Sequence, residues 1–555
     1  MGNSFGGTIL ENSMKEKIQR KTGICRILLL LCLAVFVMLG WGGSAECAEK
    51  IIFIPHDNRP ISMQQTAEVV EQAGYELVLP PEELLSRGLE EPGNPGGLWK
   101  WLEENAKSAR AAVVSTDSML YGGLIPSRKH EISQVKIDER VKQFKKFHDR
   151  HPKLKLYLFG SLMRTPKSWL YSGNEEPGYY NDYGADIFRY TALKDKEELG
   201  HLSARENAEM KEARQRIPSG VLLDWMNRRE KNLSATKQLM DLTKQGIAKC
   251  FVVGRDDNAP FCQTHKENRE LKSYAATRGM AGSQFKSLTG IDEFNLLLLT
   301  RAVNDLRNEV PFVHVLYNEG TGADTVPSYS DEHIGDSIRD SIVVAGGMLV
   351  PEPGKADFVL LVNTDPQGRT GEASFSVPGS APMVNDGNVR DGSMYFFKLL
   401  KDCLAKGYPV GIADIAFANG SDNALMENLR KDGLLKRLRA YSGWNTATNS
   451  SGFALGIGML SNRMTDAGRE RLLLRRCLDD WAYQANVRGA VENELQTAGH
   501  GEAYGQLDGF RTEEEDHVGA LLRKFAERNF PSFDGWQDLK VSFPWNRMFE
   551  CKIMF

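Results

Sequence analysis

The chain has 555 residues, of which 41% are hydrophobic and 26% are charged, and its formal net charge is −4 at pH 7. A charge so close to balance argues against nucleic acid as a partner, because nucleic-acid-binding proteins carry a basic surface. The length allows a large core and exceeds one average domain, so we expect one enlarged domain with an appendage.

The N-terminus is typical of an export signal. A basic stretch precedes residues 27–39, an apolar segment too short to span a bilayer comfortably, and small residues follow at 42–48. We predict a signal peptide over residues 1–48 and a secreted or extracytoplasmic bacterial protein, with an uncleaved anchor as the alternative. No later stretch is long and apolar enough to span, so we expect no membrane span in the mature chain.

The cysteines of the predicted mature chain show no metal-binding or disulfide pattern. They are Cys250, Cys262, Cys403, Cys477 and Cys551. Five thiols cannot all pair with one another, and no CxxC spacing occurs. Each lies in or beside an apolar run, which favours buried free thiols over a structural zinc site.

Short apolar runs alternate with amphipathic stretches from the start of the mature chain, a pattern typical of buried parallel strands joined by helices. The predicted strands of the first half cover residues 51–54, 76–79, 111–115, 154–159 and 250–253. The predicted helices cover residues 62–73, 98–105 and 135–148, and a longer helical stretch precedes the fifth strand.

The alternation continues in the second half. Strands are predicted at residues 284–289, 312–316, 358–362 and 410–413, and helices at residues 292–306 and 425–438. Asp292 is the predicted N-cap of the first of these helices. Beyond Arg469 the pattern is charged and helical, and residues 541–555 predict a terminal pair of strands. No sequence period marks a repeat architecture.

Polar residues follow many of these strands directly. A (β/α)8 barrel brings all strand ends to one face, whereas an open sheet brings only those near a switch point to a ligand. We therefore predict an α/β fold, a (β/α)8-like barrel with extra β/α units and a helical C-terminal extension. Two doubly wound α/β domains are the alternative. The predicted boundaries are residues 49–465 for a catalytic-type domain and residues 466–555 for the extension with its terminal strands.

The first two strand ends carry candidate site residues. Asp57 is suited to act as a base, nucleophile or metal ligand, and Asn58 and Arg59 to bind a substrate. An Asx-turn that starts the next helix explains Asp57 equally well. Asp117 follows the third strand, with Tyr121 and two glycines that let the backbone approach a ligand. A tight turn with Asp117 as a helix cap is the alternative.

Later strand ends add the strongest acidic pair. Asp256 and Asp257 follow a buried strand, and adjacent acids repel, so each needs a partner such as a substrate hydroxyl, a cation, or the guanidinium group of Arg255 or Arg164. An exposed acidic loop is the alternative. Asp414 ends another strand and is a further candidate acid. Asn419 follows it, although Asn419-Gly420 also fits a simple turn.

Two further residues are typical of a sugar site. Trp444 and Asn445 offer a ring for stacking and an amide for hydrogen bonds, although a buried core tryptophan is equally consistent with the pattern. Asp422 is better read as a helix cap. No HExxH or GxSxG motif occurs, which removes support for a zinc protease or a nucleophile-elbow serine hydrolase.

Four segments together resemble a known family. They are residues 55–60 (Pro-His-Asp-Asn-Arg-Pro), 117–128, 256–260 (Asp-Asp-Asn-Ala-Pro) and 443–447 (Gly-Trp-Asn-Thr-Ala). The pattern is similar to that of a group of bacterial proteins, often exported, known only as a numbered domain of unknown function. The likeness extends from about Lys50 to Leu460. It implies no established activity, so a function has to come from the residues.

The first functional hypothesis is a secreted glycoside hydrolase acting on a cell-surface or environmental glycan, because such enzymes need two carboxyl groups across the scissile bond. The candidate acids are Asp117, Asp256, Asp257, Asp57 and Asp414. This hypothesis needs no cofactor. A metal-dependent hydrolase, in which Asp57, Asp117, Asp256 and Asp257 hold a divalent ion through oxygens alone, is one alternative. A non-catalytic exported glycan-binding protein is the other.

Overall fold

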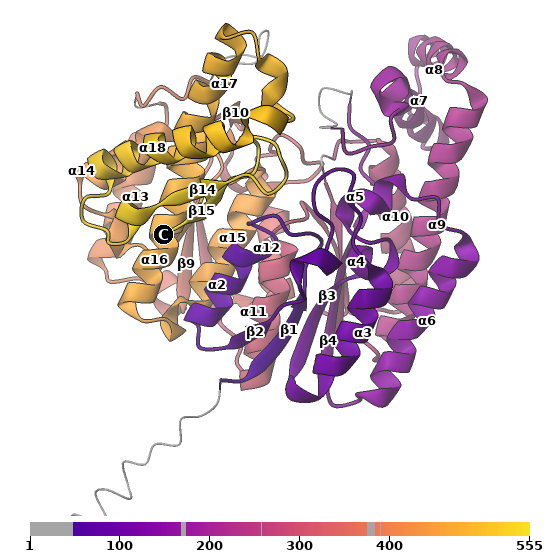
Figure 1. The fold of residues 1–555 in the computed structure, drawn as a ribbon, viewed down its shortest axis with the longest axis horizontal. Helices are drawn as coiled ribbons and strands as arrows, with labels where there is room; N and C mark the ends of the chain where they lie inside the picture. The colour runs from indigo at the N-terminus through magenta and orange to yellow at the C-terminus, as the bar shows by residue number, and fades with distance from the viewer. Residues whose placement is uncertain (1–47, 168–173, 257, 375–382, 389) are drawn as a thin grey trace, which may run out of the picture. The chain divides into compact units, whose positions relative to one another are not determined.

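The computed structural model describes residues 48–167, 174–256, 258–374, 383–388 and 390–555. Residues Glu49–Phe555 form one compact unit (Figure 1). The predicted signal peptide lies almost wholly outside the described residues, as does Asp257. Among the helices that the structure describes, none combines the length and the apolar character needed to span a bilayer.

The N-terminal half builds a six-stranded sheet in which every pair of neighbours is parallel. Its strands, in spatial order, are β2 (Glu76–Val78), β1 (Lys50–Ile54), β3 (Ala111–Ser115), β4 (Lys155–Leu162), β5 (Cys250–Arg255) and β6 (Phe285–Thr289). The apolar runs are continuous because both faces of this sheet are covered by helices. Ile51 and Phe53 face one core, and Ile52 and Ile54 face another, as strand alternation requires.

The second half builds a five-stranded parallel sheet. Its strands, in spatial order, are β8 (Met348–Leu349), β7 (Phe312–Tyr317), β9 (Phe358–Asn363), β11 (Val410–Asp414) and β13 (Ala440–Ser442). In the first sheet, β2 pairs with one edge of β1 and β3 with the other. In the second sheet, β8 and β9 flank β7 in the same way. The two halves therefore share a strand order, although the sequence carries no repeat.

The α/β class is confirmed, but the strands form two open sheets and do not close into one barrel. Closure requires each strand to pair with the next one along the chain. Here β2 does not pair with β3, and β8 does not pair with β9, because β1 and β7 lie between them. β2 and β8 are therefore edge strands. The arrangement is that of the doubly wound alternative.

A layer of helices lies between the two sheets (Figure 1). It contains α2 (Gln64–Gln72), α11 (Phe294–Arg307), α12 (Ile334–Val344) and α15 (Ala447–Leu460). Every residue of α15 is buried. Its Gly458 packs against Phe358 of β9 so closely that a Cβ atom there would lie 2.1 Å from the ring. One core therefore joins the two halves.

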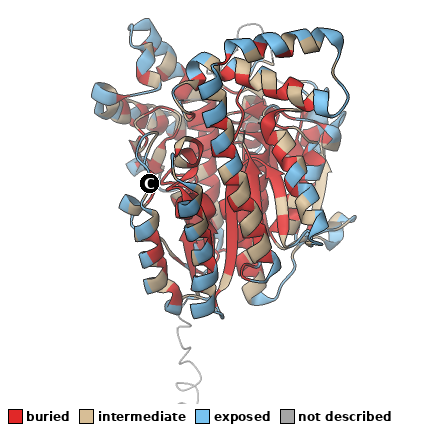
Figure 2. Ribbon diagram, turned by 90° about the vertical axis from the view of Figure 1, so that its right-hand side faces the viewer, coloured by how far each residue is buried: buried red, intermediate tan, exposed pale blue. Residues whose placement is uncertain are grey.

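Further helices cover the outer faces, and Figure 2 shows their exposed sides around buried strands. Those on the first sheet are α3 (Pro95–Asn105), α6 (Gln134–Arg150), α9 (Ser219–Lys244) and α10 (Gln263–Thr277), with α7 (Tyr180–Glu198) and α8 (Ala204–Arg216) beyond them. Those on the second sheet are α13 (Ser393–Ala405), α14 (Asn423–Lys431), α16 (Asp466–Arg476), α17 (Arg488–Thr497) and α18 (Arg511–Asn529).

The C-terminal region adds two irregular features to the second half. Cys477–Val487 form a π-helix, η8, between α16 and α17. The predicted terminal strands are present as β14 (Lys540–Ser542) and β15 (Lys552–Met554), which pair antiparallel. The five cysteines of the predicted mature chain are free and buried, as expected.

Candidate functional site

A cleft of about 390 Å³ lies where the carboxyl ends of both sheets meet. It is lined by Arg59, Leu124, Ile125, Arg164, Asn174, Glu175, Asp256, Asp292, Tyr329, Asn419, Asn445, Thr446, Tyr504, Gly505, Trp545, Arg547 and Phe549. The polar members follow strands of both halves. In doubly wound sheets, ligands bind at the carboxyl ends of the strands. Here the carboxyl ends of both sheets contribute residues to one cavity.

Arg59, directly after β1, joins two carboxylates at the floor of the cleft. Its Nη2 donates to Asp292 Oδ1 at 2.6 Å, and its Nε donates to Asp57 Oδ2 at 3.0 Å. Asp292 follows β6 and was the predicted N-cap of the next helix. The N-cap is instead Glu293, and the Asp292 side chain turns to Arg59. Arginine binds two carboxylates well because its donors are fixed in a plane.

Burial sets the protonation of Asp292. It raises the pKa of this carboxyl to about 6, against the opposing effect of Arg59, and the charges of Asp57 and Asp256 raise it further. The adjacent Glu293 is also buried, which raises its pKa well above the usual range. With a pKa of about 6, Asp292 holds its proton in mildly acidic solution and is suited to give it up.

Asp256, directly after β5, lies in the opposite environment. Its Oδ2 accepts from Arg128 Nη2 at 2.8 Å and lies 3.7 Å from Arg164 Nη1. Its side chain is 14% exposed, against 2% for Asp292. Two guanidinium groups thus surround a carboxylate that reaches the cleft.

Glu175 links these arginines to the C-terminus. Its carboxylate accepts from Arg128 at 2.7 Å and from Arg547 at 3.1 Å, and it lies 3.2 Å from Arg164. Burial alone raises the pKa of Glu175, but Arg164, Arg547, Arg128 and Arg59 together hold it well below its usual range. The cleft wall is therefore a network of paired charges.

The loop between β14 and β15 closes one side of the cleft. Trp545 in this loop donates from its indole nitrogen to Asn58 Oδ1 at 2.8 Å. Its ring lies 5.2 Å from the Arg59 guanidinium carbon and 5.0 Å from that of Arg547. Trp545 thus holds both arginines in position through cation–π contacts.

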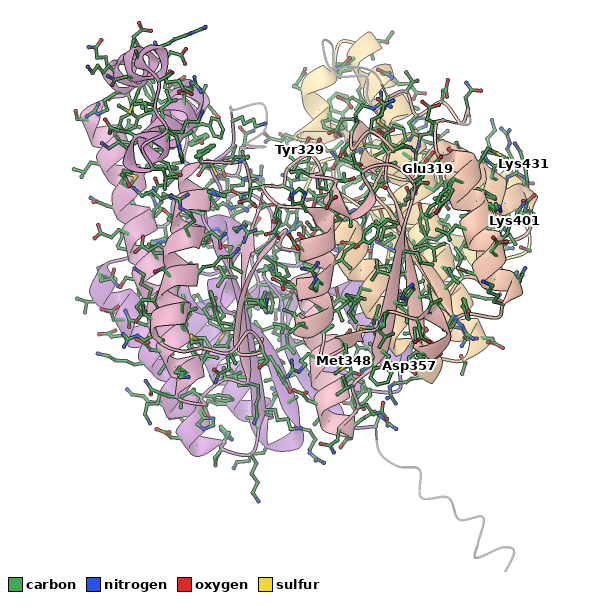
Figure 3. All side chains as sticks on the ribbon, turned by 180° about the vertical axis from the view of Figure 1, so that it is seen from behind. Glu319, Tyr329, Met348, Asp357, Lys401 and Lys431 are labelled. Carbon is green, nitrogen blue, oxygen red and sulfur yellow. The ribbon has the colours of Figure 1, made fainter. Side chains whose placement is uncertain are left out.

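Four lining residues other than glycine have left-handed backbone conformations. Their φ angles are +59° at Asn174, +64° at Tyr329, +59° at Asn419 and +58° at Asn445. Asparagine tolerates this region, but an aromatic residue there is an outlier. Glu372 accepts from Tyr329 at 2.9 Å and from Asn419 at 2.8 Å. Figure 3 labels Tyr329 between the two halves. Backbone strain of this kind concentrates at functional sites.

The family model described as "Protein of unknown function (DUF4127)" matches residues 51–554. The chain belongs to this family. No match was found among curated proteins. The family assignment confirms the resemblance expected from the sequence and brings no activity with it.

In this DUF4127 protein the cleft brings together five of the residues predicted from sequence: Arg59, Arg164, Asp256, Asn419 and Asn445. Two other predicted residues do not line the cleft but bind residues that do. Asp57 holds Arg59, and Asn58 holds Trp545.

Asp257 lies outside the described residues, and the remaining described candidates are buried away from the lining. Asp117 lies 3.7 Å from His56, and one of its carboxylate oxygens has no hydrogen-bond partner among the described residues. Asp414 accepts from Tyr441 and Asn363, and burial together with the nearby Asp422 raises its pKa.

The two aromatic candidates are part of the packing. Tyr121 stacks on His130, and Trp444 belongs to the core between the sheets. Asp422 caps α14, as predicted, by accepting from the backbone of Ala424 and Leu425.

Sequence reasoning missed several cleft residues of the DUF4127 protein. They are Asp292, Glu175, Tyr329, Tyr504, Trp545, Arg547 and Phe549. Trp545, Arg547 and Phe549 lie in a turn between two short strands, so no strand or helix period in the sequence could place their side chains. No local pattern distinguishes Asp292 from a helix cap.

The described residues offer no obvious metal site. No group of three or more His, Cys, Asp or Glu side chains with suitable geometry occurs among them. Asp57, Asp117 and Asp256 form no such group, and Asp257, the fourth acid of the predicted all-oxygen site, lies outside the described residues.

Proposed function

We propose that the protein is an exported glycoside hydrolase, with Asp292 as general acid and Asp256 as nucleophile or base. One observation carries the proposal. The two carboxyl groups line one cleft, but Asp292 is buried with a pKa of about 6, while Asp256 is paired with arginines. A pair of carboxyls in opposed environments is what glycoside hydrolysis requires.

The lining favours a hydroxyl-rich substrate. Arg59, Arg164 and Arg547 are each paired with carboxylates, so the cleft offers donors and acceptors side by side. A sugar hydroxyl both donates and accepts, and can insert into such a network without a net charge of its own. Tyr329 and Tyr504 add ring surface of the kind that binds the apolar faces of sugars.

The proposed activity takes place outside the cytoplasm of a bacterial cell. The basic stretch, apolar segment and small residues of positions 1–48 support export to the outside of a bacterial cell. A glycan at the cell surface or in the environment is then the accessible substrate.

The deciding experiment incubates the mature protein with peptidoglycan, host glycans and aryl glycosides, with and without EDTA. We expect release of reducing sugar that survives EDTA. Asp292→Asn and Asp256→Asn should each lower kcat by about 10²-fold or more, since general acid catalysis alone contributes this much. Asp195→Asn, which alters the ion pair of a buried aspartate with the partly exposed Arg269 outside the cleft, is the matched control and should keep activity.

The pH profile gives a second readout. Activity should fall as the pH rises above about 6, because Asp292 then loses its proton. Binding of a glycan without turnover would instead support the glycan-binding alternative. Activity that requires a divalent ion would support the metal-dependent hydrolase.

A further inference from the structure

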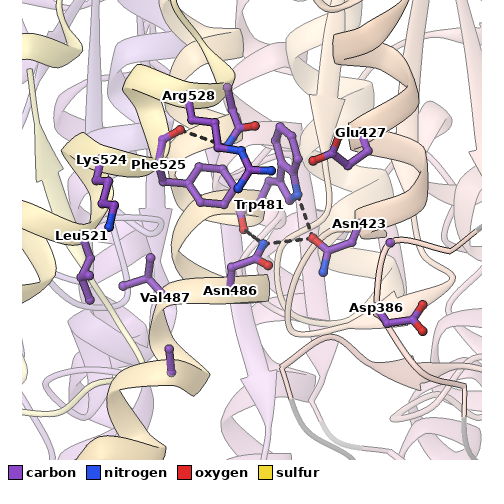
Figure 4. A pocket seen from close by; sticks show the side chains of 13 residues that line it. Asp386, Asn423, Glu427, Trp481, Asn486, Val487, Leu521, Lys524, Phe525 and Arg528 are labelled. Atoms are coloured by element: carbon purple, nitrogen blue, oxygen red, sulfur yellow. Dashed lines mark hydrogen bonds between the residues drawn. The ribbon is translucent and has the colours of Figure 1, made fainter.

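A second pocket lies away from the cleft, among α14, the π-helix η8 and α18 (Figure 4). Its volume is about 450 Å³, in the range of small-molecule sites. One wall belongs to the π-helix, a backbone form that occurs frequently at functional sites. None of the candidate residues predicted from sequence lines this pocket.

The floor of this outer pocket is held in a fixed arrangement. The indole nitrogen of Trp481 donates to Asn423 Oδ1 at 2.8 Å, and Asn486 Nδ2 donates to the same oxygen at 3.0 Å. Phe525 meets Trp481 edge to face, with ring centroids 5.2 Å apart. The result is an aromatic surface beside a bonded pair of amides, as Figure 4 shows.

Three groups around this floor form no hydrogen bond to a ligand-facing atom and no close ion pair in the described structure: Asn529 Oδ1, Lys524 and Arg528. Asn529 is 5% exposed, and its Oδ1 accepts no hydrogen bond, although its Nδ2 donates to the Phe525 carbonyl at 3.0 Å. Lys524 and Arg528, one turn apart on α18, lie within 4 Å of no carboxylate among the described residues, although the charge of Arg528 helps to lower the pKa of Glu427. An unpaired buried acceptor costs free energy unless something donates to it.

The acids of the outer pocket are already engaged. Glu427 pairs with Arg430 at 2.8 Å and lies 3.7 Å from Lys431. Asp386 accepts from the backbone and side chain of Asn388. The unsatisfied chemistry is therefore cationic, with one buried acceptor.

We propose that the outer pocket binds an acidic sugar residue. Lys524 and Arg528 bind its anionic group, a hydroxyl donates to Asn529 Oδ1, and the apolar face of the ring packs on Phe525. A carboxylated and a sulfated sugar share this chemistry. The proposal concerns binding alone and does not depend on the hydrolytic role of the cleft.

The outer pocket and the cleft share one segment of chain. Asn419 lines the cleft and Asn423 lines the outer pocket. Between them, the Ser421 amide donates to the Asp480 carbonyl at 3.0 Å, and Asp480 precedes Trp481 in the π-helix. The outer pocket and one wall of the cleft therefore both belong to the second half of the molecule.

Calorimetric titration of the mature protein tests the proposal. The probes are trigalacturonate, a sulfated trisaccharide, a neutral trisaccharide of galactose, and sodium sulfate. We expect at least one acidic trisaccharide to bind about 10-fold or more tightly than the neutral one, and sulfate alone to bind weakly. The two acidic probes separate carboxylate from sulfate recognition. The double variant Lys524→Gln/Arg528→Gln should lose about 10-fold in affinity, as expected when charge-assisted hydrogen bonds are removed.

Two further variants locate the site. Asn529→Ala should also weaken binding, whereas Lys540→Gln, which removes an exposed cation outside the pocket, should not. Equal affinity for acidic and neutral probes, or acidic binding that survives the double variant, would overturn the proposal. Sulfate binding as tight as that of the trisaccharides would reduce the pocket to an anion site and also overturn it.

Discussion

Arg59 and Asp292 are 233 residues apart in the chain, yet Arg59 Nη2 donates to Asp292 Oδ1 at 2.6 Å at the floor of the cleft. The contact joins the end of β1 to the end of β6, and β3, β4 and β5 lie between these two strands in the first sheet. Because Asp292 remains buried beside this cation, its ionisation affects the stability of the whole fold.

The pH dependence of stability should change in Asp292→Asn. The pKa of Asp292 is about 6 in the folded state, against an ordinary value of 3.8. The folded state therefore holds this proton more tightly, so its stabilising contribution is complete below pH 3.8 and is lost as the pH rises through 6. The loss amounts to about 3 kcal/mol at most.

Calorimetric Tm values of the wild type and Asp292→Asn at pH 4, 5, 6 and 7 measure this effect. The wild type should lose stability relative to the variant over this range. Arg59 keeps Asp57 as a partner in the variant, which limits other losses. The same change of Tm with pH in both proteins would contradict the raised pKa of Asp292.

Asn445 should tolerate glycine better than alanine. Its φ of +58° is a conformation that alanine adopts at a cost of about 1 kcal/mol and glycine adopts freely. Both substitutions remove the same side chain from the cleft, and both keep the backbone carbonyl that accepts from the Asn419 amide. Urea unfolding should place Asn445→Ala about 1 kcal/mol below Asn445→Gly. Equal stabilities would mean that the strain is absent.

Gly458→Ala should destabilise the layer between the sheets. The new Cβ would lie 2.1 Å from the Phe358 ring, so helix α15 and strand β9 would have to separate. Overpacking of this kind costs about 1–3 kcal/mol. The matched control is Gly220→Ala in the exposed part of α9, where a Cβ meets nothing within 4 Å. That change should be neutral or slightly stabilising, because alanine favours helix. Thermal unfolding of the pair should give shifts of opposite direction, and similar losses in both would refute the packing argument.

Trp545→Phe should weaken the attachment of the C-terminal loop. Phenylalanine keeps a ring over the two arginines but loses the indole donor to Asn58 Oδ1, so a buried acceptor is left unpaired. We expect a loss of about 1–2 kcal/mol and faster proteolytic cleavage near the C-terminus.

Trp99→Phe is the control for this change. Trp99 is also buried, but its indole nitrogen has no hydrogen-bond partner in the described structure. The substitution removes the same atoms without removing a hydrogen bond, so it should cost less. A larger loss in Trp99→Phe would show that ring packing, and not the hydrogen bond, dominates at both positions.

The sequence by itself determined the local elements. Apolar runs such as residues 51–54 and 111–115 form strands, and Asp422 caps a helix, because these outcomes depend on residues within one or two turns of each other. The resemblance to the family was equally readable from the sequence, over about residues 50–460. Four very short strands escaped prediction, namely β8, β10 (Gly371–Glu372), β12 (Phe417–Ala418) and β13, since two or three residues carry no usable periodicity.

Only the tertiary structure decided how these elements are joined. Both a barrel and two open sheets bury the same apolar runs, and the choice depends on which strand edges meet across many intervening residues. The same holds for the cleft. Asp292 looks like a helix cap in the sequence, yet the fold buries it beside Arg59, and burial raises its pKa to about 6 against the opposing effect of that arginine.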